Sequence, residues 1–357
     1  MNEHASVAQR NHGGPDAGGV PQFDFSTNSN ACGPCPLALT SVQQADASHY
    51  PDASYTALRA QLAVFHRVDI GRILLAGSAS EFIFRVTAWL RQQGGRRVCL
   101  PAHSYGDYAQ AASAWGLELT TSPAQSDLVW ACEPASPLGG SHVQWPQWLT
   151  SPAPAAPANR ARPAVLVLDR AYEPLRLSGA PSLDAEHLEK VWQMWTPNKA
   201  LGLTGVRAAY VIAPEGAQLQ VIELERLCAS WPVGAHGVAL LQAWVQPSVQ
   251  AWLSGSLQIL RDWKVRQLAL LQHLGWECTA SDTPFFCARP QGDAAFDLPR
   301  ILQHLRFAGV KLRDATSFGL PGWVRLSVQP PAAQDELIKA WKSLDSSAEK
   351  QRTQEIA

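Results

Sequence analysis

The sequence lacks several features that would place it at once in a large class of proteins. None of its apolar runs reaches the roughly 18 residues of a membrane-spanning helix. Neither sign of charge dominates, because 29 Lys and Arg stand against 30 Asp and Glu, for a net charge of −1. A near-neutral chain has no general attraction for nucleic acid or anionic lipid, so we expect neither nucleic acid nor membrane as a partner.

Targeting, disulfide and nucleotide-binding patterns are absent as well. The start, MNEHASVAQRNHGG, has no charged and apolar regions of a secretory signal, so we expect a cytoplasmic protein. The 7 cysteines are odd in number and scattered, which favours reduced thiols. Cys32 and Cys35 have metal-like spacing but lie in a Gly-Pro turn without a second pair, so we expect no metal. Neither GxGxxG nor GxxxxGK[ST] occurs.

Apolar runs and helical periods alternate along most of the 357 residues. YTALRAQLAVFH has a helical period, the run IGRILLAG suits a strand, and SASEFIFRVTAWLRQQG is helical again. RRVCLPAHSY, LVWACEP, AVLVLDRAY and AAYVIAP are further short runs typical of buried strands. Strands that alternate with helices predict an α/β fold with a mainly parallel sheet covered on both faces.

We divide the chain into three parts. Residues 1–45 are turn-rich and read as an extended arm or lid, and residues 46–244 form the large α/β domain. Residues 245–357 begin with a long helical stretch and suit a small α+β domain to which the arm also contributes. The Pro/Ala-rich segment 150–163 reads as a surface loop, and the charged end SSAEKQRTQEIA as a fraying helix.

Polar residues that follow parallel strands should converge at one edge of the sheet. In WTPNKALGLTGVR, Lys199 lies in a glycine-flanked turn, where its amine is well placed to form a Schiff base with an aldehyde cofactor. Asp169 ends a strand and Tyr172 follows it, which suits a partner for a pyridine nitrogen and a phenol donor to a ring oxygen. Ser78, Ala79 and Ser80 open a helix and offer backbone amides to a phosphate, and Tyr105 is placed to stack on a ring.

In this order the residues resemble the fold-type-I pyridoxal-phosphate enzymes of the class I/II aminotransferase family, over nearly the whole chain. The family's SxSKxxGLxGxR motif stands here as Thr196 to Arg207 around Lys199, and DEAY as DRAY from Asp169. The resemblance implies pyridoxal 5'-phosphate as cofactor, held covalently by Lys199, and a homodimer. It also implies further cofactor contacts at Thr196, Arg207, Ser136 and Tyr50, the last reaching the neighbouring subunit's cofactor phosphate.

Within the family the chain is most similar to threonine-phosphate decarboxylases of cobalamin synthesis, with histidinol-phosphate aminotransferases as near relatives. The marks are the early HGG, FSTNSN before a Gly-Pro turn, WPVGA, and GVKLRDATSFGLPGWVRLSV. This resemblance implies that Arg325 holds the substrate α-carboxylate and that His12, Asn30 and Arg313 surround a substrate phosphate. Guanidinium groups bind both kinds of anion bidentately, which suits a small-molecule amino-acid substrate that carries a phosphate.

Four positions depart from the family pattern. Ser136 stands in place of an Asn, Arg170 in place of a common Glu, Asn198 in place of Ser or Thr, and Glu133 in place of an Asn. Three functions therefore remain open for the pyridoxal-phosphate protein: a decarboxylase, an aminotransferase, or a cofactor-binding protein without catalysis.

Overall fold

The computed structural model describes residues 12–150, 164–291 and 297–355, the side chains from residue 345 onward excepted. The contacts divide the chain into two compact units. Unit 1 comprises Met1–Asn28, Trp263–Thr279 and Phe285–Ala357, and unit 2 comprises Ser29–Asp262 and Ala280–Pro284. The division expected from the sequence, at residues 45 and 244, stays a prediction about domains. Among the described residues, no helix is both long enough and apolar enough to cross a membrane.

A seven-stranded sheet forms the centre of unit 2 in the described part of the chain. All neighbours run parallel except around β8, which is antiparallel to β2 and β7. This arrangement confirms the predicted α/β class with a mainly parallel sheet. The order is β2 (Ile73–Ala76), β8 (Ala209–Ile212), β7 (Trp192–Trp195), β6 (Val165–Asp169), β5 (Leu128–Cys132), β3 (Arg97–Cys99) and β4 (Glu118–Thr120).

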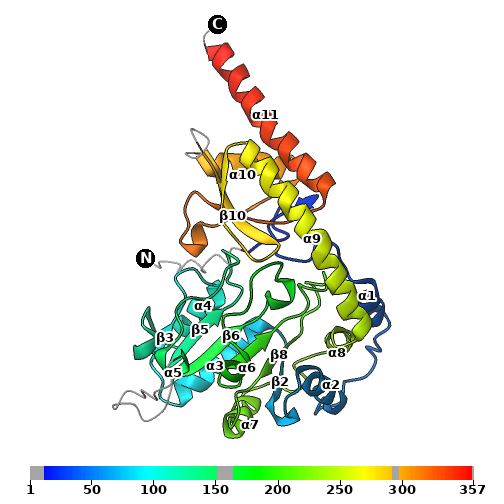
Figure 1. Cartoon of the computed structure of the whole chain (residues 1–357), viewed down its shortest axis with the longest axis vertical. Coiled ribbons are helices and arrows are strands. Elements are labelled where there is room, and N and C mark those ends of the chain that lie inside the picture. The colour runs from blue at the N-terminus through cyan, green and yellow to red at the C-terminus, as the bar shows by residue number, and fades with distance from the viewer. Residues whose placement is uncertain (1–11, 151–163, 292–296, 356–357) are drawn as a thin grey trace, which may run out of the picture. The chain divides into compact units, whose positions relative to one another are not determined.

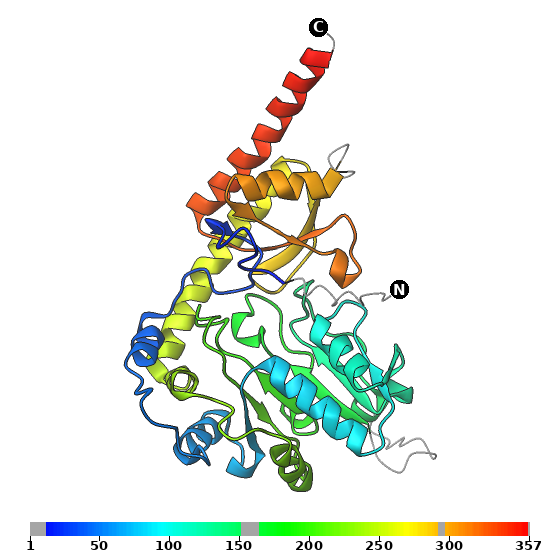
Figure 2. The same ribbon diagram turned by 180° about the vertical axis from the view of Figure 1, so that it is seen from behind.

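Helices cover both faces of this sheet (Figure 1). Seen from behind, α3 and α4 lie in front of the strands (Figure 2). Ser78 is the N-cap of α3, and its hydroxyl accepts a hydrogen bond from the Glu81 amide at 3.1 Å. The helices of unit 2 are α1 (Pro36–Gln43), α2 (Thr56–His66), α3 (Ala79–Gln92), α4 (Gly106–Ala114), α5 (Gln147–Thr150), α6 (Ala185–Leu188), α7 (Gln218–Arg226), α8 (Ala235–Trp244) and the first part of α9 (Pro247–His273).

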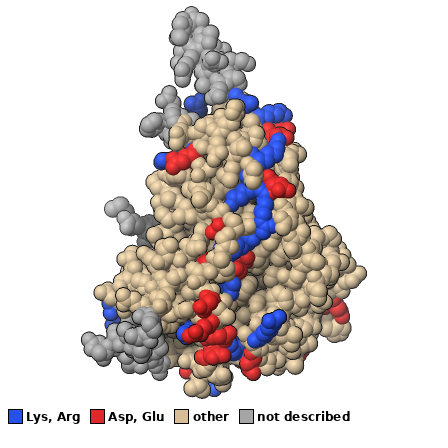
Figure 3. All heavy atoms as spheres, viewed as in Figure 1, with Lys and Arg blue, Asp and Glu red and all other residues tan. Residues whose placement is uncertain are grey.

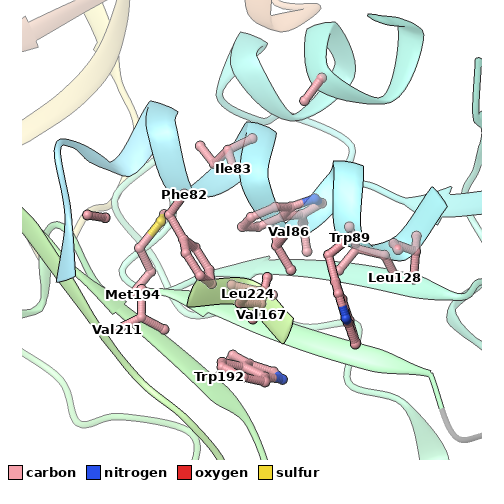
Figure 4. Packing of buried hydrophobic residues seen from close by; sticks show 14 of the residues in the cluster. Phe82, Ile83, Val86, Trp89, Leu128, Val167, Trp192, Met194, Val211 and Leu224 are labelled. Atoms are coloured by element: carbon pink, nitrogen blue, oxygen red, sulfur yellow. The ribbon is translucent and has the colours of Figure 1, made fainter. Parts of the chain in front are cut away.

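Alternation along the strands builds one core on each face of the sheet. Leu128 and Trp130 of β5 belong to one cluster with Phe82, Val86 and Trp89 of α3. Figure 4 shows Leu128 beside these side chains of α3. Val129 and Ala131 alternate with Leu128 and Trp130 along the strand and belong to the cluster on the opposite face, together with Leu149 of α5. Burial on both faces explains why these strands read as continuous apolar runs.

Several elements were not predicted from the sequence, among them β7, β4 and α1. β7 contains Gln193, which breaks its apolar run, yet all four of its residues are buried in the sheet. β4 is short and none of its three residues is buried, so it has no alternating apolar pattern. Helix α1 lies inside the segment expected to be an extended arm, and Pro36 at its first position is compatible with a helix start. The predicted 150–163 loop lies outside the described residues from residue 151 on.

Unit 1 combines the N-terminal segment with the C-terminal third. β1 (Phe23–Asp24) pairs parallel with β11 (Val310–Lys311). A four-stranded antiparallel sheet has the order β12 (Arg313–Asp314), β13 (Val324–Ser327), β10 (Phe285–Pro290) and β9 (Trp276–Cys278). The remainder of α9, α10 (Leu298–Phe307) and α11 (Pro331–Glu355) complete the unit.

The surface carries few charges, in agreement with a charged fraction of 17%. On the face shown in Figure 3 most of the area is uncharged, and the basic and acidic side chains lie interspersed.

A partly buried histidine makes the stability of unit 2 sensitive to pH. His66, at the end of α2, shares a hydrogen bond of 2.7 Å between its Nε2 and the Tyr210 hydroxyl, which also accepts from Trp244 Nε1 at 3.0 Å. Burial, and then the charge of Arg170, lower the pKa of His66 to about 4. The folded protein therefore keeps this ring neutral at pH values where the unfolded chain protonates it.

Because of this histidine, we expect the free energy of unfolding to fall by up to about 3 kcal/mol as the pH falls from about 6.5 to about 4. The protein becomes less stable because, across that pH range, the unfolded state binds a proton that the folded state does not bind. Denaturant unfolding of wild type and His66→Gln at several pH values measures the difference in slope. The exposed His236→Gln is the control; an equal slope in wild type and His66→Gln would contradict the prediction.

Candidate active site

The predicted catalytic residues gather at the carboxyl ends of neighbouring strands in unit 2. Asp169 ends β6, and Lys199 follows β7, its neighbour in the sheet. The Lys199 ammonium lies 3.5 Å from the Thr196 hydroxyl and 5.5 Å from the centre of the Tyr172 ring. The amine is only partly buried, whereas Tyr172 is 9% exposed. The structure thus brings the lysine, the tyrosine and the threonine together.

The turn that carries Lys199 is fixed from outside by the segment that follows residue 28. The Asn30 amide donates to the Lys199 carbonyl at 2.9 Å, and the Cys35 amide donates to the Leu201 carbonyl at 2.8 Å. Gly202 has a φ of +68°, and a Cβ there would lie 2.9 Å from the Cα of Gly33. Only glycine fits such a close approach at this φ, which gives the glycine of the motif a structural reason.

Asn30, predicted to lie near a substrate phosphate, uses its side chain inside unit 2. Its amide nitrogen donates to the Ala200 carbonyl at 3.0 Å and to the Ser256 hydroxyl at 2.8 Å, and its oxygen accepts from the Cys32 amide. The side chain is 3% exposed. These bonds hold the Lys199 turn, and contact with a phosphate stays a prediction.

Asp169 is a buried carboxylate with two donors. The Tyr108 hydroxyl donates to its Oδ2 at 2.6 Å, and the Ala171 amide donates to its Oδ1 at 2.9 Å. Burial raises the pKa of Asp169, and the hydrogen bond from Tyr108 and the charge of Lys199 act in the opposite direction. An acid in this setting prefers a cationic or N–H partner, because its charge is costly without one.

Two tyrosines shape the wall beside this carboxylate. Tyr108 stacks on Trp130 with ring centres 4.4 Å apart and 9° between the planes. Tyr105, the predicted stacking residue, meets Tyr108 edge-on at 5.9 Å, and its hydroxyl lies 3.3 Å from the Ser80 hydroxyl. Burial raises the pKa of both phenols, so both remain protonated donors.

Tyr108 was not among the residues predicted for the site. It lies in the first turn of α4, three residues after Tyr105, which is the N-cap of that helix. This spacing was the available signal. Cys132, at the end of β5, was missed as well: its thiol lies 3.4 Å from the Pro134 carbonyl and interacts electrostatically with Asp169 and Lys199. Burial raises the pKa of this thiol and keeps it protonated.

The predicted phosphate-binding residues are only partly gathered. Ser78, Ala79 and Ser80 open α3, whose first amides have no partner within the helix, although Ser78 itself caps the Glu81 amide. Thr196 is buried next to Lys199, whereas Arg207 is exposed. Tyr50 is 78% exposed and stacks on Trp231 at 4.5 Å. The phosphate contacts of these residues remain predictions.

Ser136 lies in a tight loop after β5. The side chain is 8% exposed, and the loop closes on itself through a bond from the Ala135 amide to the Gly140 carbonyl at 2.7 Å. The neighbouring Glu133 carboxylate accepts from the Ser182 amide at 2.8 Å and contacts Arg176 at 3.4 Å. Glu133, which departs from the family pattern, is thus a buried and hydrogen-bonded residue.

The residues predicted to bind substrate through charge lie in unit 1. Arg313 and Arg325 face each other as register partners of β12 and β13, and are 4% and 7% exposed. Both guanidinium groups lie over the Phe318 ring, at 5.0 and 5.5 Å. Burial, and then the positive charge of Arg325, lower the pKa of Arg313 to about 10. The fold therefore holds two like charges together inside the protein.

The early HGG segment packs near this pair. A Cβ on Gly13 would lie 2.1 Å from the Ser26 carbonyl oxygen, so glycine is required for this close approach. The same carbonyl accepts from Arg325 Nη2 at 2.8 Å, and the Gly14 amide donates to the Ser26 hydroxyl at 2.8 Å. Ser26 thus links the backbone beside His12, which is exposed, to Arg325.

Metal ligands do not cluster in the ranges given above: no group of three or more His, Cys, Asp or Glu residues there could hold an ion. Cys32 and Cys35 are free thiols, and burial raises the pKa of Cys32 to about 11.

Comparison with known proteins agrees with this arrangement. The family model "Aminotransferase class I and II" matches residues 20–341, so the chain belongs to this family. The predicted family, with its pyridoxal-phosphate cofactor, is confirmed. A histidinol-phosphate aminotransferase of Jannaschia sp. (strain CCS1) is 26% identical over 349 residues, covering 92% of each chain.

Two solved structures show the same fold. One is the histidinol-phosphate aminotransferase of Sinorhizobium meliloti in complex with pyridoxal-5'-phosphate, with a TM-score of 0.75 and 20% identity over 96% of this chain and 99% of that one. The other is the L-threonine-O-3-phosphate decarboxylase of Porphyromonas gingivalis, with a TM-score of 0.71 and 20% identity over 90% of this chain and 99% of that one.

Proposed function

We propose that Lys199, Asp169, Tyr172 and Tyr105 hold pyridoxal 5'-phosphate in unit 2. The donor set suits this group: a primary amine, a buried carboxylate, a buried phenol and a partly buried aromatic ring lie within one cluster. The residues proposed to bind its phosphate are Ser78, Ala79, Ser80, Thr196 and Arg207. The residues proposed to contact its ring oxygen are Ser136 and Tyr172. A homodimer, with Tyr50 reaching the partner, belongs to the same proposal.

The chemistry divides between the cofactor and the chain. When bound, pyridoxal phosphate supplies an electron sink for a bond broken at the α-carbon of an amino compound. Asp169 would accept a hydrogen bond from the ring nitrogen, and its charge would keep that nitrogen protonated. Lys199 would hold the aldehyde of the cofactor, and its amine would carry a proton to or from the reacting carbon.

The buried pair Arg313 and Arg325 is the observation that supports a doubly anionic substrate. Two guanidinium groups side by side in a buried setting repel each other, and an anionic ligand relieves that cost. A substrate with both a carboxylate and a phosphate offers one anion to each fork. We therefore propose decarboxylation of a phosphorylated hydroxyamino acid, L-threonine O-3-phosphate first, with His12, Asn30 and Arg313 near the phosphate.

The second candidate is amino transfer from histidinol phosphate. It is favoured by the curated relative from Jannaschia sp., which is named a histidinol-phosphate aminotransferase. The two reactions differ in what they need, because a decarboxylase releases carbon dioxide without an oxo acid, whereas an aminotransferase requires one.

A product assay separates the two reactions. Holoenzyme incubated with threonine phosphate alone is expected to release carbon dioxide. In Arg313→Ala we expect kcat/KM to fall by the factor that corresponds to a loss of about 2 to 5 kcal/mol of transition-state binding. Arg289→Ala, which removes a 46% exposed arginine of the same unit, should leave the rate unchanged. Steady amino transfer from histidinol phosphate to 2-oxoglutarate, with no carbon dioxide from threonine phosphate, would overturn the decarboxylase in favour of the aminotransferase.

A further inference from the structure

Four charged side chains form a continuous buried row in unit 2. Arg170 Nη2 lies 3.5 Å from Glu173 Oε1, Glu173 Oε2 lies 2.8 Å from Arg176 Nη2, and the same Nη2 lies 3.4 Å from Glu133 Oε1. The exposed fractions of these side chains are 11% for Arg170, 15% for Glu173, 8% for Arg176 and 4% for Glu133. The signs alternate, so each charge contacts only charges of the opposite sign within the row.

Neutral groups anchor both ends of the row. Arg170 Nη1 donates to Gln193 Oε1 at 3.0 Å, and its guanidinium lies 4.4 Å from the centre of the Trp195 ring. Glu133 accepts from both the amide and the hydroxyl of Ser182. The charges are therefore held in one arrangement rather than left to sample several, since every end has a fixed partner.

The row joins the two loops that carry the proposed contacts to the cofactor ring oxygen. Glu133 opens the loop of Ser136, and its amide donates to the Asp169 carbonyl at 3.1 Å. Arg170 and Glu173 flank Tyr172 on either side in the sequence. β5 and β6, which lead into these loops, are neighbours in the sheet (Figure 1).

The far end of the Ser136 loop is held as well. The Asp282 amide donates to the Gly139 carbonyl at 2.8 Å, and a Cβ on Gly139 would lie 2.0 Å from the Ser281 hydroxyl. A loop fixed at Gly139 and at Glu133 leaves Ser136 little freedom to move relative to Tyr172.

Two of the four charges stand at positions where the chain departs from the family pattern, Arg170 for a common Glu and Glu133 for an Asn. A glutamate at 170 would place two carboxylates side by side with Glu173. An asparagine at 133 would leave two arginines to share one carboxylate. Either change by itself breaks the balance of two positive and two negative charges in the row, so the row as it stands needs both residues.

We propose that Glu133 and Arg170 are positioning residues, which act through this row to fix the separation of Ser136 and Tyr172 at the cofactor ring oxygen. The proposal rests on the proposed cofactor site, and it assigns a joint role to two departures that the family pattern leaves unexplained.

The test compares Glu133→Gln with Glu189→Gln. Glu189 pairs with Arg72, whose side chain is 7% exposed, and that pair makes no contact with the row. Both variants lose one carboxylate from a buried arginine. We expect both variants to unfold at a lower denaturant concentration. Only Glu133→Gln is expected to speed exchange at the loop amides of residues 135, 136, 138 and 139 in the cofactor-free protein, and to weaken cofactor binding roughly 3- to 100-fold.

The outcomes separate this proposal from the cofactor proposal. Faster exchange at these loop amides with unchanged cofactor affinity, or effects equal in the two variants, would overturn the positioning role. A wild type that binds no pyridoxal phosphate would overturn the cofactor site, while the exchange data would still report whether the row holds the loop. If Glu133→Gln does not fold, Ser182→Ala loosens the same carboxylate from its other side, and the same exchange and affinity shifts are expected in smaller size.

Discussion

Replacing Lys199 by alanine is expected to abolish both the visible absorbance of the purified protein and its turnover. Only an amine forms a Schiff base with an aldehyde cofactor, and Lys199 is the amine beside Thr196 and Tyr172 at the end of β7. The same amine is the proposed proton carrier, so the variant loses covalent attachment and proton transfer together. General acid–base catalysis alone contributes roughly 10²- to 10⁴-fold, which sets a lower bound on the loss.

Absorbance spectra and single-turnover assays of wild type and Lys199→Ala measure this effect. Lys190→Ala is the control, because Lys190 is a 45% exposed lysine of the same unit that pairs with Glu186. A colourless wild type that takes up no added pyridoxal phosphate would contradict the cofactor site as a whole. A Schiff-base absorbance that persists in Lys199→Ala would place the covalent attachment on another amine.

Asp169→Asn is expected to lower turnover by at least about a hundredfold and cofactor affinity by far less. The substitution keeps the shape of the side chain and an oxygen for the Tyr108 hydroxyl, but removes the charge that we propose keeps the ring nitrogen protonated. A fixed charge of this kind acts mainly on the transition state, where removing one electrostatic contact typically costs roughly 10²- to 10³-fold. Steady-state rates, together with cofactor titration, separate the two effects.

Tyr108→Phe serves as the graded comparison. It removes one donor to Asp169 and leaves the carboxylate and the stacking on Trp130 in place, so a smaller loss of turnover is expected. Equal losses of affinity and turnover in Asp169→Asn would show that the residue supports the fold of the site and not the reaction. Unchanged turnover would move the role of ring-nitrogen partner to another group.

Local patterns in the sequence determined the class of fold and the family. Continuous apolar runs such as those ending at Cys132 and Asp169 predict buried parallel strands, because only strands covered on both faces are apolar throughout. The spacing from Thr196 to Arg207 and from Asp169 to Tyr172 identified the cluster at the strand ends. These features lie within a few residues of one another, so the sequence displays them directly.

Contacts between residues far apart in the chain were decided only by the tertiary structure. β7 is a strand despite Gln193, because it pairs with β6 and β8 along its two edges and the buried Gln193 side chain bonds to Arg170 and to the Leu188 carbonyl. Tyr108 meets Asp169 across 61 positions, and Asn30 reaches Ala200 across 170.

The row from Arg170 to Glu133 follows the same rule. Arg170 and Glu133 stand out in the sequence only as departures from a pattern, and their compensation appears when Glu173 and Arg176 lie between them. A charge is stabilised by whatever lies a few ångströms away, whichever part of the chain supplies it. The sequence therefore specified which chemical groups the site contains, and packing of the sheet and its loops decided which of them are partners.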